Sequence, residues 1–125
     1  MMNTREVSTI NGIRLIETKS VRDARGAFVK FHPVSEFEDP LDSIAFSLNP
    51  NLGTIRGMHF QIEPFAEEKL ITCVQGSIFD VIIDLRPKSK TFGKWTSFNL
   101  SASNSTQIYI PKGMAHGFQT LMLIQ

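Results

Sequence analysis

Apolar and polar residues alternate along the chain in short runs, which is the pattern of β-strands rather than of helices. The longest run is interrupted by Gly76, where we expect a turn or a bulge. Stretches rich in proline, glycine, serine and asparagine separate the runs and indicate turns. Five stretches of the sequence are therefore predicted to be strands or strand pairs: 13–21, 26–34, 69–86, 95–102 and 106–111.

Helical periodicity is almost absent from the sequence. Only residues 35–42 have a composition that allows a helical turn, and Pro40 would end it early. There is no internal repeat and no linker-like segment. Many short strands separated by turns predict one all-β domain over residues 1–125, built as an antiparallel sandwich, barrel or jelly roll.

Composition narrows the class of protein but not its function. The chain is 42% hydrophobic and 20% charged, with a formal net charge of +1, so charge indicates neither a nucleic-acid partner nor a membrane partner. Cys73 is the single cysteine, which excludes an intramolecular disulfide and favours a place in the core. With no signal-peptide pattern and no apolar stretch near the roughly 20 residues of a membrane span, we expect a cytoplasmic protein.

Polar residues at strand positions supply the first sign of a binding site. In the stretch "GMHFQ", His59 and Gln61 share one face of the predicted strand. Small β-barrels bind ligands at the mouth or in the interior, where inward side chains occupy every second position. An inward-facing polar pair is therefore a candidate site, although His59 taken alone would more often be a structural histidine.

Two spacings resemble the paired motifs of the cupin family of small barrels. Five residues separate Gly53 from His59, six separate Lys69 from Gly76, and "PKGMAH" ends at His116. Metal-binding cupins carry His, His, Glu and His at the ligand positions. The corresponding residues here are His59, Gln61, Lys69 and His116.

The lysine at one of these positions argues against a metal site. A protonated lysine has no lone pair to donate and repels a cation. We therefore expect a pocket without metal, in which the ammonium group can stabilise an anion that develops on a bound substrate. A metal-dependent cupin enzyme is the less favoured alternative.

Longer blocks of the sequence resemble one particular family. "RGMHFQ", "DVIIDLRPKSKTFGKW" and "IPKGMAHGF" are similar, in order and spacing, to the dTDP-4-dehydrorhamnose 3,5-epimerase family. The resemblance implies a cupin-type jelly-roll barrel of antiparallel strands. It also implies an enzyme that epimerises a nucleotide-linked 4-keto-6-deoxy sugar at C3 and C5 without a metal or an organic cofactor.

The resemblance also assigns roles to individual residues. It implies that His59 is the base that removes a proton next to the ketone and that Lys69 is a cation near the developing enolate. Asp80, in mid-strand, is positioned to orient a histidine or a lysine, whereas Asp84 has Arg86 or Lys88 as an equally good partner. Five further residues are expected to contact the sugar or the diphosphate: Arg25, Asn49, Arg56, Gln61 and His116.

Three departures from the family pattern leave a second function open. Ser47 stands where relatives have a glutamine, and Lys30 stands where many have a glutamate. Relatives also continue past this sequence and supply a tyrosine as proton donor, which Tyr109 does not match. The alternatives are an epimerase with a slow reprotonation step and a catalytically weak cupin that binds sugar nucleotides.

The same resemblance predicts a homodimer. Family members are dimeric through exchanged N-terminal strands, and residues 13–21 are the segment suited to that exchange.

Overall fold

The chain folds almost entirely into antiparallel strands, as the alternation predicts. A computed structural model describes residues 2–6, 10–31 and 37–122, and no helix occurs among them, so none is present there that would be long and apolar enough to span a membrane. The strands are β1 (Met2–Glu6), β2 (Arg14–Thr18), β3 (Val21–Asp23), β4 (Gly26–Phe28), β5 (Ile55–His59), β6 (Lys69–Thr72), β7 (Ser77–Asp84), β8 (Trp95–Ser101), β9 (Thr106–Ile110) and β10 (Met114–Met122).

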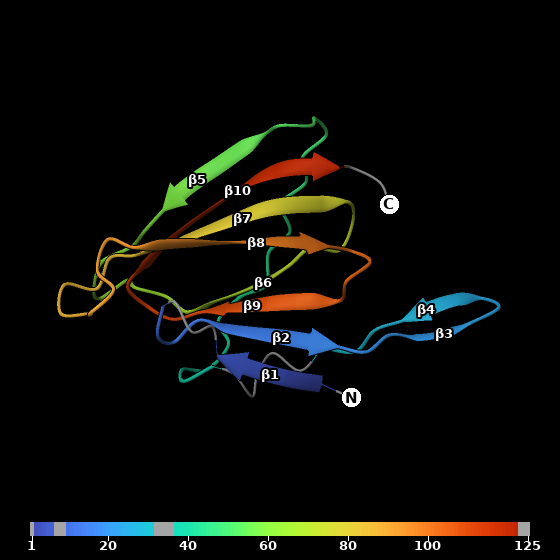
Figure 1. Ribbon diagram of the computed structural model, residues 1–125, viewed down its shortest axis with the longest axis horizontal. Coiled ribbons are helices and arrows are strands. Elements are labelled where there is room, and N and C mark those ends of the chain that lie inside the picture. Colours follow the sequence, from blue (N-terminus) through green and yellow to red (C-terminus); the bar gives the residue numbers. More distant parts are fainter. Residues whose placement is uncertain (1, 7–9, 32–36, 123–125) are drawn as a thin grey trace.

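Two four-stranded sheets face each other and a two-stranded hairpin extends from one end (Figure 1). The first sheet has the order β1-β2-β9-β6 and the second β5-β10-β7-β8. Because β9 and β10 belong to different sheets, the turn at 111–113 crosses between them. The hairpin of β3 and β4 projects beyond both sheets.

The predicted strands are found with two differences in extent. Among its described residues the stretch 26–34 forms a strand over Gly26–Phe28, and its residues 32–34 lie outside the described residues. The possible helical turn at 35–42 also lies partly outside them, and residues 37–42 are not helical. Pro40 accounts for the absence of a helix there, since it removes a backbone donor and restricts the residue before it.

Apolar side chains from both sheets meet between them. Inward residues recur with period two, as in Ile108 and Ile110 of β9, and Cys73 belongs to the same cluster, as predicted. The buried cluster consists of Ile10, Ile13, Cys73, Ile82, Leu100, Ile108, Ile110 and Met114.

The strand β7 places two carboxylates in this interior. Its buried positions alternate, so Asp80, Ile82 and Asp84 all face inward and are fully buried. Ile82 joins the apolar cluster. A buried carboxylate must be paired to be tolerated, and each of the two has a different partner.

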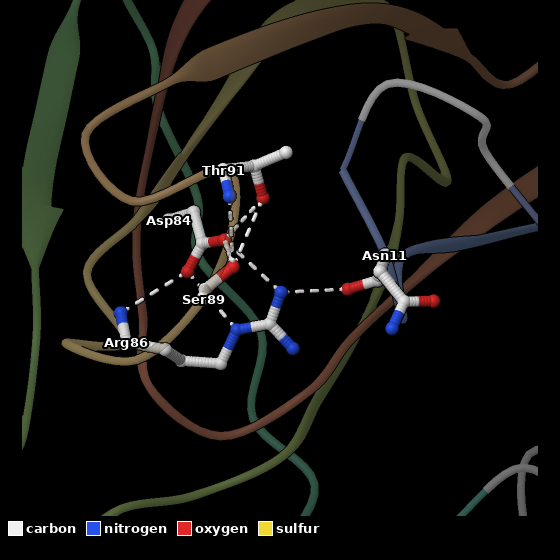
Figure 2. A network of polar contacts seen from close by, with 5 residues as sticks. All are labelled: Asn11, Asp84, Arg86, Ser89 and Thr91. Atoms are coloured by element: carbon white, nitrogen blue, oxygen red, sulfur yellow. Dashed lines mark hydrogen bonds and ion pairs between the residues drawn. The ribbon is translucent and has the colours of Figure 1, made fainter.

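Asp84 is held by five hydrogen bonds at the end of β7 (Figure 2). Its Oδ1 accepts from the backbone N–H and Nε of Arg86, both at 3.0 Å, and its Oδ2 accepts from Arg86 Nη2 at 3.0 Å. The hydroxyls of Ser89 and Thr91 each donate to Oδ2 at 2.6 Å. Burial favours the neutral acid, but these donors outweigh burial and hold the pKa of Asp84 far below its usual range.

This network fixes several turns at one end of the barrel. Arg86 Nη2 also donates to the backbone oxygen of Asn11 at 2.7 Å. The backbone N–H of Leu85 donates to the carbonyl of Gly113, where a Cβ would lie 2.5 Å from Arg86 Cγ. The chain at 113 therefore needs glycine, and its position depends on the Asp84–Arg86 pair.

Replacing Asp84 with asparagine should lower the free energy of unfolding by about 3 kcal/mol at pH 7, since the partly buried guanidinium of Arg86 loses the fully buried carboxylate that is its counter-charge. The lowered pKa of Asp84 means that its contribution is present above the unfolded-state value near 3.9 and is lost as pH falls below about 4. Urea denaturation of the wild type and of D84N across pH 3–7 measures both effects. D42N, at an exposed position, is the matched control, and an equal loss in both variants would contradict the assignment.

Candidate active site

A bulge between β5 and β10 brings two histidines together. His59 lies opposite His116, while Arg56 lies opposite Phe118, so three steps along β5 match two along β10. His116 and Phe118 share one face of β10, and their partners on β5 therefore share that face as well. In a regular strand the odd spacing would have separated Arg56 from His59; the extra residue removes that separation.

Two glycines make this bulge possible. A Cβ at Gly57 would lie 2.7 Å from the carbonyl oxygen of His116, and a Cβ at Gly117 would lie 2.8 Å from that of Arg56. Gly57 also has a φ of +100°, which side chains disfavour. The close approach of the two strands, and with it the pairing of the histidines, depends on both positions lacking a side chain.

Four of the residues predicted from the sequence line one cavity of about 400 Å³: His59, Gln61, Lys69 and His116. They come from three strands and the segment after β5, because the structure ends β5 at His59 and Gln61 lies just beyond it. The remaining lining residues are Phe60, Glu67, Gly113 and Met114. The residues at the four cupin ligand positions thus converge, although they lie up to 57 positions apart in the sequence.

The buried carboxylate of Asp80 orients one of these histidines. Its Oδ2 lies 2.7 Å from His116 Nε2, and both side chains are buried. Burial raises the pKa of Asp80, and the hydrogen bond from His116 opposes that rise. When Asp80 is ionised it accepts from Nε2–H, which leaves Nδ1 as the ring nitrogen that Asp80 does not engage. The prediction that Asp80 faces a histidine or a lysine agrees with this contact.

Lys69 has a carboxylate partner that the sequence reasoning missed. Its ammonium group pairs with the carboxylate of Glu67, and both residues line the cavity. Period two in an extended segment places residues 67 and 69 on one face. That signal was present in "EEKL" and would have indicated Glu67.

Arg56 and Asn49 lie beside the cavity rather than in it. Arg56 Nε donates to Asn49 Oδ1 at 2.6 Å. Asn49 lines an adjoining open groove of about 1170 Å³, which shares Glu67, Lys69 and His116 with the cavity. Residues of β6, of β10 and of the segment 37–50 also line the groove.

Arg25 is placed far from this cavity within one chain. It occupies the tip of the β3–β4 hairpin, its side chain is 90% exposed, and it pairs with Asp23 at 2.6 Å. The hairpin points away from the two sheets (Figure 1). The structure of one chain therefore does not bring Arg25 to the other predicted site residues.

Glu68 points to the opposite side from Glu67 and fastens the segment that borders the groove. Its carboxylate accepts from the backbone N–H groups of Glu38 and Asp39 at 2.8 and 3.0 Å and from the hydroxyl of Tyr109. Partial burial favours its neutral form, but these donors outweigh burial and lower the pKa of Glu68.

Tyr109 is thereby committed to a structural contact. It is buried, and burial together with the neighbouring carboxylate raises the pKa of its hydroxyl far above the usual value. Its ring also lies 4.4 Å from the guanidinium carbon of Arg14 and packs edge-on against Phe37. The hydroxyl does not line the cavity, which agrees with the expectation that Tyr109 is not the proton donor.

The donor set of the cavity is not that of a metal centre. No cluster of three or more histidine, cysteine, aspartate or glutamate side chains suited to a metal ion occurs among residues 2–6, 10–31 and 37–122. Two imidazoles beside a lysine ammonium instead provide a base, a hydrogen-bonding group and a positive charge around one small volume.

Solved structures of dTDP-sugar epimerases have the same fold as this chain. A crystal structure of dTDP-4-dehydrorhamnose 3,5-epimerase from Bacillus anthracis with TDP and PPi bound superposes with a TM-score of 0.84 at 41% identity, covering 98% of this chain and 73% of that one. A dTDP-6-deoxy-D-glucose-3,5-epimerase from Legionella pneumophila in complex with dTDP-4-keto-L-rhamnose has a TM-score of 0.88 at 35% identity, covering 98% and 67%. The expected cupin-type antiparallel barrel is thereby confirmed.

The family follows from the sequence comparison. The family model of dTDP-4-dehydrorhamnose 3,5-epimerase matches residues 7–123, and the chain belongs to that family. It is 41% identical over 118 residues to the dTDP-4-dehydrorhamnose 3,5-epimerase of Sinorhizobium fredii, covering 90% of this chain and 60% of that protein. The chain spans 60–65% of the length of four such relatives.

Replacing Glu68 with glutamine should loosen the segment 37–42 and lower the free energy of unfolding by about 1–2 kcal/mol, because charge-assisted hydrogen bonds to backbone N–H groups are lost. Since the pKa of Glu68 is lowered, its stabilisation is present above the usual glutamate value near 4.3 and disappears as pH falls through the folded-state pKa. Hydrogen exchange at the amides of Glu38 and Asp39 reports the loss directly. E67Q, on the opposite face, should leave those two amides unchanged, and equal exchange in E68Q and wild type would refute the role.

Proposed function

We propose that the protein epimerises a dTDP-linked 4-keto-6-deoxy sugar at C3, C5 or both, by removing and returning a proton next to the ketone. A carbon-bound proton beside a carbonyl is weakly acidic because the electron pair it leaves behind becomes an enolate. A catalyst therefore needs a base at that carbon and positive charge at the carbonyl oxygen. Membership of the epimerase family and the convergence of His59 and Lys69 in one cavity support this reaction.

In this proposal His59 removes the proton and Lys69 stabilises the enolate oxygen. His59 is exposed at the end of β5 and lines the cavity, so a sugar ring can reach its imidazole. Lys69 lines the same cavity from the first position of β6. As His59 takes the proton, the carbon–hydrogen electron pair forms a carbon–carbon double bond and the carbonyl π pair moves to the oxygen. When the enolate collapses back to the ketone, a proton from solvent water adds to the opposite face of the carbon and inverts it.

The other cavity residues bind and orient the sugar. His116 is held by Asp80 and keeps one ring nitrogen for a hydrogen bond to the ligand. Gln61 offers an amide from the segment after β5. Because His116 is already held by Asp80, it loses little freedom when a ligand binds.

The adjoining groove suits the nucleotide part of the substrate. It is larger than the cavity and shares three lining residues with it, so a ligand with its sugar in the cavity can continue into the groove. Arg56 and Asn49 are joined by a hydrogen bond beside this continuation. An arginine fork is well matched to diphosphate oxygens, and the Bacillus anthracis relative is a structure with TDP and PPi bound.

We also propose a homodimer in which the β3–β4 hairpin of each chain docks on the other. Val21 and Phe28 are directly paired across the hairpin, so they share one face, and they are 68% and 66% exposed. Two such side chains on a projecting hairpin need an apolar cover. Docking on a second copy provides it and carries Arg25, at the hairpin tip, toward the second copy's pocket.

Replacing His59 with alanine or asparagine should abolish solvent-deuterium incorporation next to the ketone of a dTDP-4-keto-6-deoxy sugar. A positioned base contributes about 10²–10⁴-fold in rate, so the loss is measurable by proton NMR in D₂O. I55A, an exposed position on the same strand, controls for disturbance of β5, and circular dichroism checks folding. Undiminished exchange by H59N would exclude His59 as the base, and binding without any exchange by the wild type would favour the sugar-nucleotide-binding alternative.

Substituting serine for both Val21 and Phe28 should convert a dimer to a monomer. Burial of these side chains stabilises a complex by about 1.5–3 kcal/mol each, so their loss from both hairpins should weaken association by at least about 100-fold. Light scattering at micromolar concentration measures the mass of wild type and variant. F92S removes an exposed phenylalanine from the turn between β7 and β8 and should leave the mass unchanged; a monomeric wild type would overturn the proposal.

A further inference from the structure

Glu67 is the only carboxylate among the described residues that line the cavity, and it is held against the group that the proposed reaction needs free. Its carboxylate pairs with the ammonium of Lys69, with half of the Glu67 side chain exposed and a quarter of that of Lys69. Neither side chain is therefore locked in the interior, and a ligand entering the cavity meets both.

The local backbone explains why this pairing is specific. Glu67 and Lys69 both line the cavity where the chain enters β6, whereas Glu68, between them in the sequence, does not line it. Glu68 is fully engaged by Tyr109 and the backbone N–H groups of Glu38 and Asp39. Two adjacent glutamates thus have separate tasks, and only Glu67 faces the cavity.

A carboxylate in this position has two opposing effects on an anionic substrate. It holds the long lysine side chain in one direction, so the ammonium is already aimed into the cavity before a ligand binds. It also adds a negative charge beside the pocket and competes with the ligand for the same ammonium. The first effect favours the chemical step, and the second weakens binding.

We propose that Glu67 is a positioning residue that directs the ammonium group of Lys69 toward the substrate's carbonyl oxygen. As negative charge develops on that oxygen, the ammonium group leaves the Glu67 carboxylate and pairs with the oxygen instead. The inference deepens the proposed epimerase function and rests on it. No covalent step is added: the ammonium exchanges one carboxylate oxygen for the substrate oxygen, and Glu67 stays ionised and turns to solvent, to which half of its side chain is already exposed.

The test is the variant E67Q, which keeps the shape of the side chain and removes its charge. Freed from its partner, Lys69 regains rotamer freedom, so kcat should fall on the order of tenfold. The dissociation constant for dTDP should instead decrease about 2–5-fold, because an exposed opposing charge is gone. E67D keeps the charge and should retain the wild-type affinity for dTDP with partial recovery of kcat.

A matched control separates this role from changes in net charge or folding. E63Q removes the same charge from the exposed segment between β5 and β6, outside the cavity, and should change neither quantity. A purely structural role for Glu67 would lower the thermal midpoint and reduce kcat without tightening dTDP. That result, or unchanged kcat and affinity in E67Q, would overturn the proposal.

Lysine labelling keeps the inference testable if the wild type shows no turnover, a result that would count against the proposed function alone. Reductive methylation followed by peptide mass spectrometry reports each ammonium separately. Lys69 should react several-fold faster in E67Q than in wild type, while Lys88, on the turn after β7, reacts equally in both. Equal labelling of Lys69 in the two proteins would show that Glu67 does not hold it.

Discussion

The inward face of β7 carries the constraint from which most of this structure follows. Three successive inward positions of one strand hold a carboxylate, an isoleucine and a carboxylate, all fully buried. The central residue joins the apolar core, and each carboxylate must find donors to remain there. Asp80 pairs with a histidine of the pocket, and Asp84 accepts hydrogen bonds from an arginine and two hydroxyls that hold the turns after β7. One strand thereby links the stability of the barrel to the orientation of its site.

Much of this arrangement could be read from the sequence because it depends on period two and on motif spacing. Alternation predicted the strands β6 to β9, and the motif spacings identified four of the eight residues that line the cavity. The sequence alone also distinguishes the partners of Asp80 and Asp84, since Asp80 lies in mid-strand and Asp84 lies close to Arg86.

Other features could not be read because they depend on contacts between segments distant in the sequence. The face of Arg56 is set by a register shift against β10, which no local pattern in β5 reveals. The separation of Arg25 from the pocket follows from the direction of a hairpin. The roles of Glu67 and Glu68 follow from what each side chain reaches, the cavity for Glu67 and Tyr109 for Glu68. Alternation indicates which residues share a face of a strand, but it does not indicate which other segment packs against that face.

The extra residue in β5 makes the two glycines that accommodate it as important to the pocket as the residues that line it. Between Arg56 and His59 the regular alternation of side chains is interrupted, so the two residues share a face although they are three positions apart. Gly57 and Gly117 allow the two backbones to come close enough for this bulge. A side chain at either glycine would force the two strands apart. If regular alternation then replaced the bulge with no residue lost, the three steps would turn Arg56 or His59 outward. In related chains, loss of glycine at position 57 or 117 would therefore mark a rearranged pocket even where every other motif residue is retained.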